Sequence, residues 1–294
     1  MSKIDLHIHT NVSGDGEYSS QEIVAECKLQ NMDLIAVTDH NSVRGVADAL
    51  AVAGGLRVLP GVELDCTYGE KNFHLLGYGF DYTRKEFTEI EQDIFRQEKN
   101  IGEEKIHLFT KATNIPVCAA EVFAASDGGV VTGELIAEIV LARENAVQYE
   151  ILRPYLPGGS KSDMPNVRFY WDFFSEGKPA YVPVHYLTLP EAVALIHNTG
   201  GIAVLAHPGQ NFAGDDSLLP GIIDSKIDGI EVFSSYHNQT TSMHYLEIAE
   251  CHGLLVTCGS DFHGKHKPDI RLGGHGAFRG DRWLMAGIGA RLRY

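Results

Sequence analysis

The feature that most constrains the fold of this chain is a regular alternation of short apolar segments with helical patterns. Strands are expected at seven apolar segments, residues 4–8, 34–37, 57–64, 73–78, 202–205, 230–233 and 254–257. Strands that alternate with helices form parallel sheets through βαβ crossovers. Seven or eight such units close most naturally into a barrel. We therefore predict an α/β barrel of the TIM-like kind, with an open doubly wound sheet as the alternative.

One region interrupts this alternation. A single long charged helix with an apolar stripe is expected from 84 to about 108. Shorter helical pieces follow, separated by Gly128-Gly129 and by Pro157-Gly158-Gly159-Ser160. We predict that 84–180 is a mainly helical insertion that caps the substrate, between barrel segments 1–83 and 181–276. The tail, 277–294, has too weak a pattern to predict an element.

Composition argues against several classes of protein. The net charge is −15, from 39 acidic and 24 basic side chains. Binding to duplex DNA requires lysines and arginines that neutralise phosphates, so such a partner is not expected. We find neither an apolar run long enough to span a membrane nor a signal peptide. Five widely spaced cysteines without a Cys-x-x-Cys pair favour reduced thiols, so we expect a cytoplasmic protein. The oligomeric state stays open.

The chain has 14 histidines, and many of its metal-ligand residue types lie in or just after the predicted strands. These residues are His7, His9, Asp15, Asp39, His40, Glu63, His74, His207, Glu231, Asp261 and His263. The carboxyl ends of barrel strands meet at one mouth, so we expect these side chains to lie close together.

Such a set of side chains is typical of a centre that binds several metal ions. Imidazoles and carboxylates together favour Zn²⁺, Mn²⁺ or Fe, and a carboxylate can bridge two ions. Two ions about 3.5–4 Å apart can hold a hydroxide in line with a phosphoryl group. Neither a Gly-x-Ser-x-Gly nucleophile motif nor a P-loop is present. The pattern therefore favours metal-dependent hydrolysis.

Single residues of this set have simpler interpretations. A His-x-His pair is equally often a pair of ordinary core or surface histidines, and Asp39 alone could cap a helix. Glu231 either supports a ligand or lies on the surface. Glu63 is harder to dismiss, because an unpaired carboxylate in an apolar strand is costly to bury.

Five motifs, in order along the chain, resemble those of the PHP (polymerase and histidinol phosphatase) family. They are Asp5-Leu6-His7-Ile8-His9-Thr10, Thr38-Asp39-His40, Gly61-Val62-Glu63, Ala206-His207-Pro208-Gly209 and Ser260-Asp261-Phe262-His263. The resemblance covers 3–276 and implies a distorted (β/α)7 barrel with metal-dependent phosphoesterase activity. The insertion is similar to that of bacterial members acting on mononucleotides, nucleoside 3′,5′-bisphosphates or short oligonucleotides.

The resemblance also implies a ligand set for two or three divalent ions. The ion positions would be held by His7, His9, Glu63 and Asp261, by Glu63, His74 and His207, and by Asp15, His40 and His263. Mn²⁺ is favoured, with Zn²⁺, Fe²⁺ or Mg²⁺ as alternatives. Catalysis would depend on Asp261, Glu63 and His207 through hydroxide on the ions. Asp5, Asp39 and Glu231 are expected to orient histidines rather than to bind an ion.

One departure from the family concerns the substrate. Nucleotide-hydrolysing relatives usually carry Gly-Arg-Pro-His at the start of a helix in the insertion, whereas residues 130–137 read VVTGELIA. Replacement phosphate contacts could come from Arg153, Lys161, Arg168 and Lys178, although each is equally well a solvated loop charge. His237 lies where relatives place a histidine facing the site, so we predict a substrate contact there.

The leading hypothesis is hydrolysis of a phosphate ester of a small substrate, a nucleotide. A phosphatase for histidinol phosphate or another small molecule is an alternative. An amidohydrolase is disfavoured, because those sites place a lysine where Glu63 stands and no lysine lies at a matching strand end. A catalytically silent protein that binds metal or nucleotide is the alternative from another class.

Overall fold

The computed structural model describes residues 2–126 and 128–292. The chain divides into two compact units, which we call the barrel unit and the helical unit. The barrel unit contains the residues up to Ile90, the segment Tyr186–Gly264 and the residues from Ile270 onward. The helical unit contains Glu91–His185 and Lys265–Asp269. That the helical unit caps a substrate stays a prediction.

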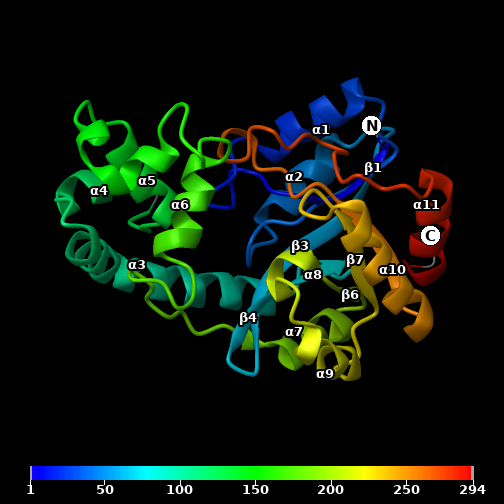
Figure 1. The fold of residues 1–294 in the computed structure, drawn as a ribbon. Helices are drawn as coiled ribbons and strands as arrows, with labels where there is room; N and C mark the ends of the chain where they lie inside the picture. Colours follow the sequence, from blue (N-terminus) through cyan, green and yellow to red (C-terminus); the bar gives the residue numbers. More distant parts are fainter. Residues whose placement is uncertain (1, 127, 293–294) are drawn as a thin grey trace. The chain divides into compact units, whose positions relative to one another are not determined.

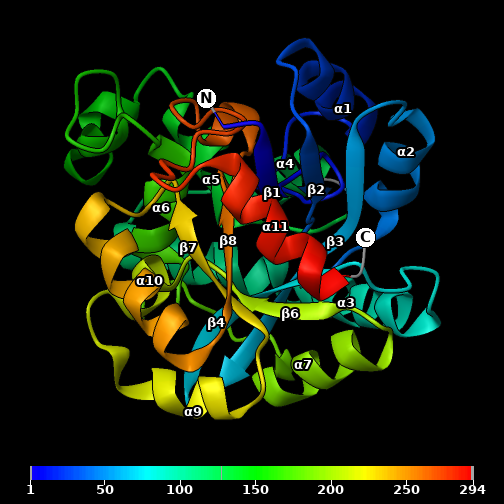
Figure 2. The same cartoon turned by 90° about the vertical axis from the view of Figure 1, so that its right-hand side faces the viewer.

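The strands of the barrel unit form one sheet that nearly closes on itself (Figure 2). They are β1 (Ile4–Ile8), β2 (Leu34–Val37), β3 (Arg57–Tyr68), β4 (Lys71–Tyr78), β5 (Leu187–Thr188), β6 (Ile202–Leu205), β7 (Gly229–Ser234) and β8 (Leu255–Gly259). Seven of them follow the order β1-β2-β3-β4-β6-β7-β8, and the short β5 pairs with β3. Beyond the end of β8, the amide of His9 donates to the carbonyl of Phe262 across the closure. The predicted seven-stranded α/β barrel is confirmed, and the open sheet is wrong.

The direction of β4 differs from the prediction of a parallel sheet. It runs antiparallel to both of its neighbours, β3 and β6. Only Gly69 and Glu70 separate β3 from β4, which is too short a link for a crossover helix and allows only a hairpin. Gly69 has a φ of +63°, which suits a tight turn. Because β4 is reversed, His74 in its first half lies where the parallel strands end.

Helices cover the outside of the barrel. They are α1 (Ser20–Leu29), α2 (Arg44–Val52), α7 (Leu189–Asn198), α8 (Pro208–Phe212), α9 (Leu219–Asp224), α10 (Gln239–His252) and α11 (Asp281–Leu292), with a 3-10 turn at Asp216–Leu218. Another 3-10 turn, Gly264–His266, begins in the barrel unit and ends in the helical unit. A capping box opens α1, because the side chains of Ser19 and Glu22 each accept a hydrogen bond from the other residue's backbone amide. The sequence pattern predicted no element at α11, whose helix contains Gly287 and Gly289. Its Leu284 and Ile288 are nevertheless buried in the core, and the helix packs on β8.

The helical unit, whose helices are drawn in Figure 1, has a core of its own. Helix α3 (Lys85–Thr113) begins in the barrel unit and continues in the helical unit, which also contains α4 (Ala119–Ala125), α5 (Gly133–Leu141), α6 (Pro165–Phe173) and 3-10 turns at Ala146–Gln148 and Glu150–Tyr155. Phe109, Phe169 and Phe173 pack together at its centre, with ring centroids 4.7–5.4 Å apart. Among the helices in the described part of the chain, none has the length and hydropathy needed to cross a bilayer.

Candidate metal centre

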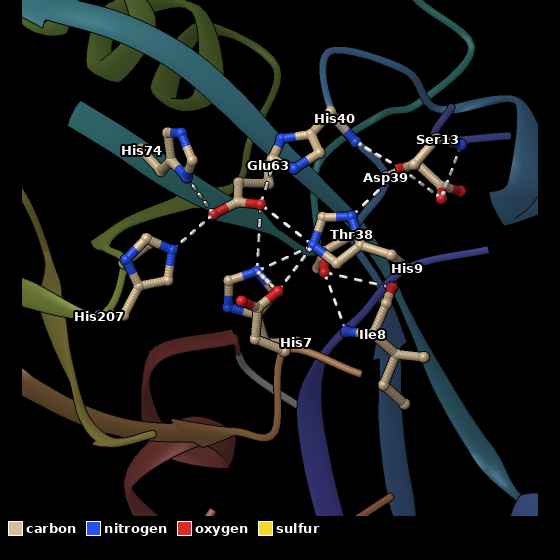
Figure 3. A network of polar contacts seen from close by, with 12 residues as sticks. His7, Ile8, His9, Ser13, Thr38, Asp39, His40, Glu63, His74 and His207 are labelled. Carbon is tan, nitrogen blue, oxygen red and sulfur yellow. Dashed lines mark hydrogen bonds and ion pairs between the residues drawn. The ribbon is translucent and has the colours of Figure 1, made fainter. Parts of the chain in front are cut away.

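The first group of ligand-type atoms lies at the end of β1. His7 and His9 are two residues apart on a buried strand, so their rings leave the same face and their Nε2 atoms lie 3.1 Å apart (Figure 3). Oε2 of Glu63 lies 3.1 Å from both of these nitrogens. Oδ1 of Asp261 lies 3.4 Å from Nε2 of His7 and 3.1 Å from Nε2 of His9. Four atoms from three strand ends therefore converge.

These distances test whether the first group suits a metal ion. Five of the six distances among these four atoms are 3.1–3.4 Å, and all six are within 4.8 Å. In a regular tetrahedron with such edges, the centre lies at about 0.61 of the edge from each corner. That is about 2 Å, the distance at which Zn²⁺ and similar ions bind imidazole nitrogen and carboxylate oxygen. The donor set and its spacing therefore fit a divalent ion.

The second group surrounds the other oxygen of Glu63. Oε1 lies 2.9 Å from Nδ1 of His74 and 3.1 Å from Nε2 of His207 (Figure 3). The predicted trio of Glu63, His74 and His207 is thus brought together. His40 also belongs here, because its Nδ1 lies 3.3 Å from Oε2 of Glu63 and it forms a possible ion site with Glu63 and His74.

The third group is more open to solvent than the first. Nε2 of His263 lies 3.0 Å from Oδ2 of Asp15, and Nε2 of His40 lies 3.8 Å from the same oxygen. The structure adds His9 to this predicted trio. Since His9, His40 and Glu63 each belong to two groups, the clusters are continuous and consistent with a polynuclear metal centre. The assignment of particular ligands to particular ions stays a prediction.

Several buried polar atoms of the cluster support this interpretation. Within the described residues, Oδ1 of Asp15, Nδ1 of His40 and Nδ1 of His207 have no hydrogen-bond partner. Nearly all buried polar atoms in proteins have one, so such a concentration requires an explanation. Divalent ions would supply the missing partners for the atoms that face the groups.

The metal-free cluster neutralises itself electrostatically. Burial alone would lower the pKa of His7, but Glu63, Glu231 and Asp261 hold that pKa well above its ordinary value. Burial alone would raise the pKa of Glu63, but the surrounding histidines hold that pKa well below its ordinary value, and His7 has the largest effect among them. The pKa values of His9 and His74 are raised as well, so these three histidines carry protons while no ion is bound, and ions would displace those protons.

The predicted supporting carboxylates make different contacts. Glu231 is fully buried, and its Oε1 lies 3.0 Å from Nδ1 of His7 while its Oε2 accepts the amide of His207 at 2.9 Å. Asp39 reaches His9 only through the hydroxyl of Ser13, which lies 2.9 Å from Asp39 and 3.1 Å from Nδ1 of His9.

Asp5 lies further from the histidine rings than predicted. Its carboxylate accepts the amides of Ser260 and Gly273 and the hydroxyl of Ser260. It also accepts the amide of His7 at 3.2 Å. Asp5 therefore fixes backbone at both edges of the barrel closure.

That His237 binds substrate stays a prediction, and the contacts of its ring weaken it. Its Nδ1 donates to the carbonyl of Val232 at 2.8 Å, and its Nε2 accepts the amide of Gly209 at 3.0 Å. Burial lowers its pKa, in keeping with a neutral ring. Both ring nitrogens are therefore occupied by backbone, and the ring fixes the turn that follows His207.

Three of the four predicted phosphate contacts are engaged by neighbours in the helical unit. Arg168 forms two hydrogen bonds, of 2.7 and 2.5 Å, to Asp163. Lys161 pairs with Asp172, and Arg153 donates to the carbonyl of Val147 at 3.0 Å. Lys178 is exposed. Their roles as substrate contacts stay predictions, and the pairing weakens them for Arg168 and Lys161.

Sequence reasoning missed two residues of the site. The hydroxyl of Tyr236 donates to Oδ2 of Asp261 at 2.6 Å, so that Oδ1 is the oxygen that faces His7 and His9. Tyr236 follows β7 in a loop, where no pattern marks it. Asp65 lies 3.0 Å from Nε2 of His74. The alternation of β3 would have placed Asp65 on the face of Glu63, had the strand been predicted beyond residue 64.

Comparisons with known proteins agree with this geometry. A family model described as the PHP domain matches residues 5–149. A 3′,5′-nucleoside bisphosphate phosphatase of Chromobacterium violaceum is 30% identical over 271 residues, which cover 90% of this chain and 88% of that protein. The 5′-3′ exoribonuclease Rnm of Escherichia coli is 27% identical over 97% of this chain and 90% of its own length.

Solved structures share the fold along the whole chain. A Chromobacterium violaceum structure described as an amidohydrolase, with bound sulfate and no metal, has a TM-score of 0.76 at 25% identity and covers 97% of both chains. A Bifidobacterium adolescentis protein assigned to the metal-dependent phosphoesterases has a TM-score of 0.74 at 24% identity, covering 98% of this chain and 96% of its own. Together with the buried histidine and carboxylate clusters, these relationships establish that the chain belongs to the PHP-domain family of metal-dependent phosphoesterases.

Proposed function

We propose that this phosphoesterase hydrolyses a phosphate ester of a nucleotide, namely a mononucleotide, a nucleoside 3′,5′-bisphosphate or a short oligonucleotide. The observation that carries the proposal is the close convergence of His7, His9, Glu63 and Asp261, continuous with two further ligand groups. The relatives named as a bisphosphate phosphatase and as exoribonucleases support the nucleotide as the substrate class.

The side chains of the cluster would hold two or three divalent ions. When bound, such ions supply positive charge for the phosphoryl oxygens and lower the pKa of water. Glu63 faces the first group with Oε2 and the second with Oε1, so it spans both. Glu231 fixes the ring of His7 and the backbone of His207. Tyr236 holds one oxygen of Asp261, so that the other points into the cluster. These residues preorganise the site before a substrate arrives.

The charge distribution supports a small substrate. With a net charge of −15, the surface repels a long nucleic acid overall. Arg168 and Lys161 in the helical unit are each paired with an aspartate. The attraction for an anionic substrate would therefore come from ions in the cluster, which act over a short range in salt. One or a few phosphates fit this arrangement better than a long polymer.

The test is phosphate release by metal-loaded protein from mononucleotides, a nucleoside 3′,5′-bisphosphate, short RNA and histidinol phosphate, with metal content measured on the same sample. We expect nucleotides to be the better substrates. His7→Ala, Glu63→Ala and Asp261→Ala should abolish the activity. His244→Ala is the matched control, since His244 is an exposed histidine paired with Asp216 outside the cluster. Undiminished activity in the three cluster variants would refute the proposal. A preference for histidinol phosphate would show that the substrate is not a nucleotide.

A further inference from the structure

We propose that Asp65 is a positioning residue that fixes the ring of His74, so that Nδ1 of this ring is presented to the metal ions. The inference rests on the metal centre proposed above. Asp65 and Glu63 are two residues apart on β3, so both side chains leave the same face of the strand. His74 lies directly opposite Asp65 in the antiparallel pairing of β3 with β4. The hairpin therefore places one imidazole between two carboxylates.

The two ring nitrogens of His74 each face one of these carboxylates. Nδ1 lies 2.9 Å from Oε1 of Glu63, and Nε2 lies 3.0 Å from Oδ1 of Asp65. A neutral imidazole carries its proton on one nitrogen and a lone pair on the other. An ion next to Glu63 needs the lone pair on Nδ1, so the proton must stay on Nε2. A carboxylate that accepts this Nε2 proton selects that tautomer and holds the plane of the ring.

Asp65 is itself held in place by Asn41. Oδ2 of Asp65 accepts the side-chain amide of Asn41 at 2.6 Å, and the backbone amide of Asp65 donates to Oδ1 of Asn41 at 2.9 Å. The backbone amide of Asn41 donates in turn to the carbonyl of Glu63 at 2.7 Å. These three bonds fix Oδ1 of Asp65 toward His74. Asp65 is mostly buried, with 17% of its side chain exposed, so water competes little for that oxygen.

The negative charge of Asp65 also helps to hold the ring of His74 with Nδ1 toward the ions. An ionised carboxylate accepts a stronger hydrogen bond than a neutral amide oxygen does. It also increases the electron density on the imidazole, which strengthens binding through Nδ1. Asp65→Asn therefore keeps the size of the side chain but removes its negative charge, on which the inference depends.

The experiment compares Asp65→Asn and Asp65→Ala with the wild-type protein and with Asp228→Asn. Asp228 is a matched control, because it contacts Nε2 of His197 at 2.7 Å and the amide of Ala203 at 2.8 Å outside the ligand cluster. Chelator-treated proteins are titrated with Mn²⁺ and with Zn²⁺, and the number and affinity of bound ions are measured. Nitrogen-15 NMR of histidine-labelled, Zn²⁺-loaded protein reports which nitrogen of His74 binds.

We expect each Asp65 variant to bind one ion about 10- to 100-fold more weakly, the range typical of a lost partner to a ligand histidine, with the other ions unaffected. Asp228→Asn should match the wild type. In the wild-type protein the NMR signals should show binding through Nδ1. Unchanged affinity in both Asp65 variants, or binding of wild-type His74 through Nε2, would overturn the inference and leave the proposed function standing. A wild-type protein that binds fewer than two ions would overturn the metal centre and this inference together.

Discussion

Removal of the metal ions should make the stability of the protein fall between pH 6.5 and about 9. Burial by itself lowers the pKa of His9, but its hydrogen bonds to Asp261 and Glu63 raise that pKa to about 9 in the metal-free fold. In the unfolded chain the pKa is close to 6.5. A group whose pKa is raised by folding stabilises the fold fully below its unfolded pKa, and this contribution is lost as the pH rises through the folded pKa.

The size of the effect follows from the same two values. At about 1.4 kcal/mol per pH unit, the difference between 6.5 and about 9 corresponds to about 3 kcal/mol for His9. An unfolding entropy of about 2 cal/mol/K per residue over 294 residues converts this to a fall in Tm of about 5 °C. The pKa values of His7 and His74 are also well above normal, so both residues act in the same direction.

Other groups of the cluster do not cancel this fall. The pKa values of Glu63 and Asp15 are held well below normal against the effect of burial, so their contribution is lost only in acid. Burial lowers the pKa of His40, and the stability linked to that shift changes below pH 6.5. Between pH 6.5 and 9 the raised histidines therefore dominate.

The assay is thermal unfolding of chelator-stripped and metal-loaded protein in steps from pH 6.5 to 9.5. The stripped protein should lose Tm across this range. The loaded protein should not, because ions bind the deprotonated histidines and their affinity rises with pH. His9→Asn should reduce the loss of Tm, whereas His244→Ala, which changes an exposed ion pair, should not. A Tm of the stripped protein that stays constant or rises would refute the reasoning.

Three further substitutions test single contacts. Gly209→Ala should lower the free energy of unfolding by about 1–3 kcal/mol in urea, because the Cβ of the new alanine would lie 2.7 Å from a carbon of the His237 ring. An unchanged urea midpoint would contradict this packing. Tyr236→Phe should weaken ion binding about tenfold in a metal titration, because Asp261 loses the hydrogen bond from the phenol hydroxyl. An affinity equal to that of the wild type would show that this hydrogen bond is dispensable. Arg168→Ala should leave KM for a phosphorylated substrate unchanged, because a carboxylate already engages this arginine; a marked rise in KM would restore it as a substrate contact.

The sequence predicted the barrel because its buried strands are short, apolar and separated by helices. It did not predict the reversal of β4, because an apolar strand has the same pattern in either direction. Only the length of the link between β3 and β4 decides whether the two strands run parallel or antiparallel. Here the two-residue link was hidden by polar residues at the strand ends, such as Asp65 and Lys71. Helix α11 was hidden because its glycines weaken the helical pattern, and its stability comes from packing on β8.

The site also contains contacts that the sequence pattern predicts and contacts that depend on tertiary packing. His7 and Glu63 belong to motifs whose spacing places them at strand ends, so the sequence was sufficient to bring them together. His237 and Tyr236 follow β7, and their roles depend on the partner within reach, which is a carbonyl of β7 for His237 and a carboxylate after β8 for Tyr236. Such contacts are tertiary, and no periodicity along the chain encodes them.

The β3–β4 hairpin has a consequence for the order in which the ligand groups can form during folding. Glu63 and His74 are 11 residues apart in the chain, so their contact needs only a local turn. The bond from Ser260 to Asp5 at the closure of the barrel joins residues 255 apart, and the pairing of His7 with Asp261 depends on that closure. Contacts between distant segments form slowly, because a long loop must be closed first. The hairpin part of the site can therefore form early in folding, whereas the first ligand group can form only when the barrel is complete.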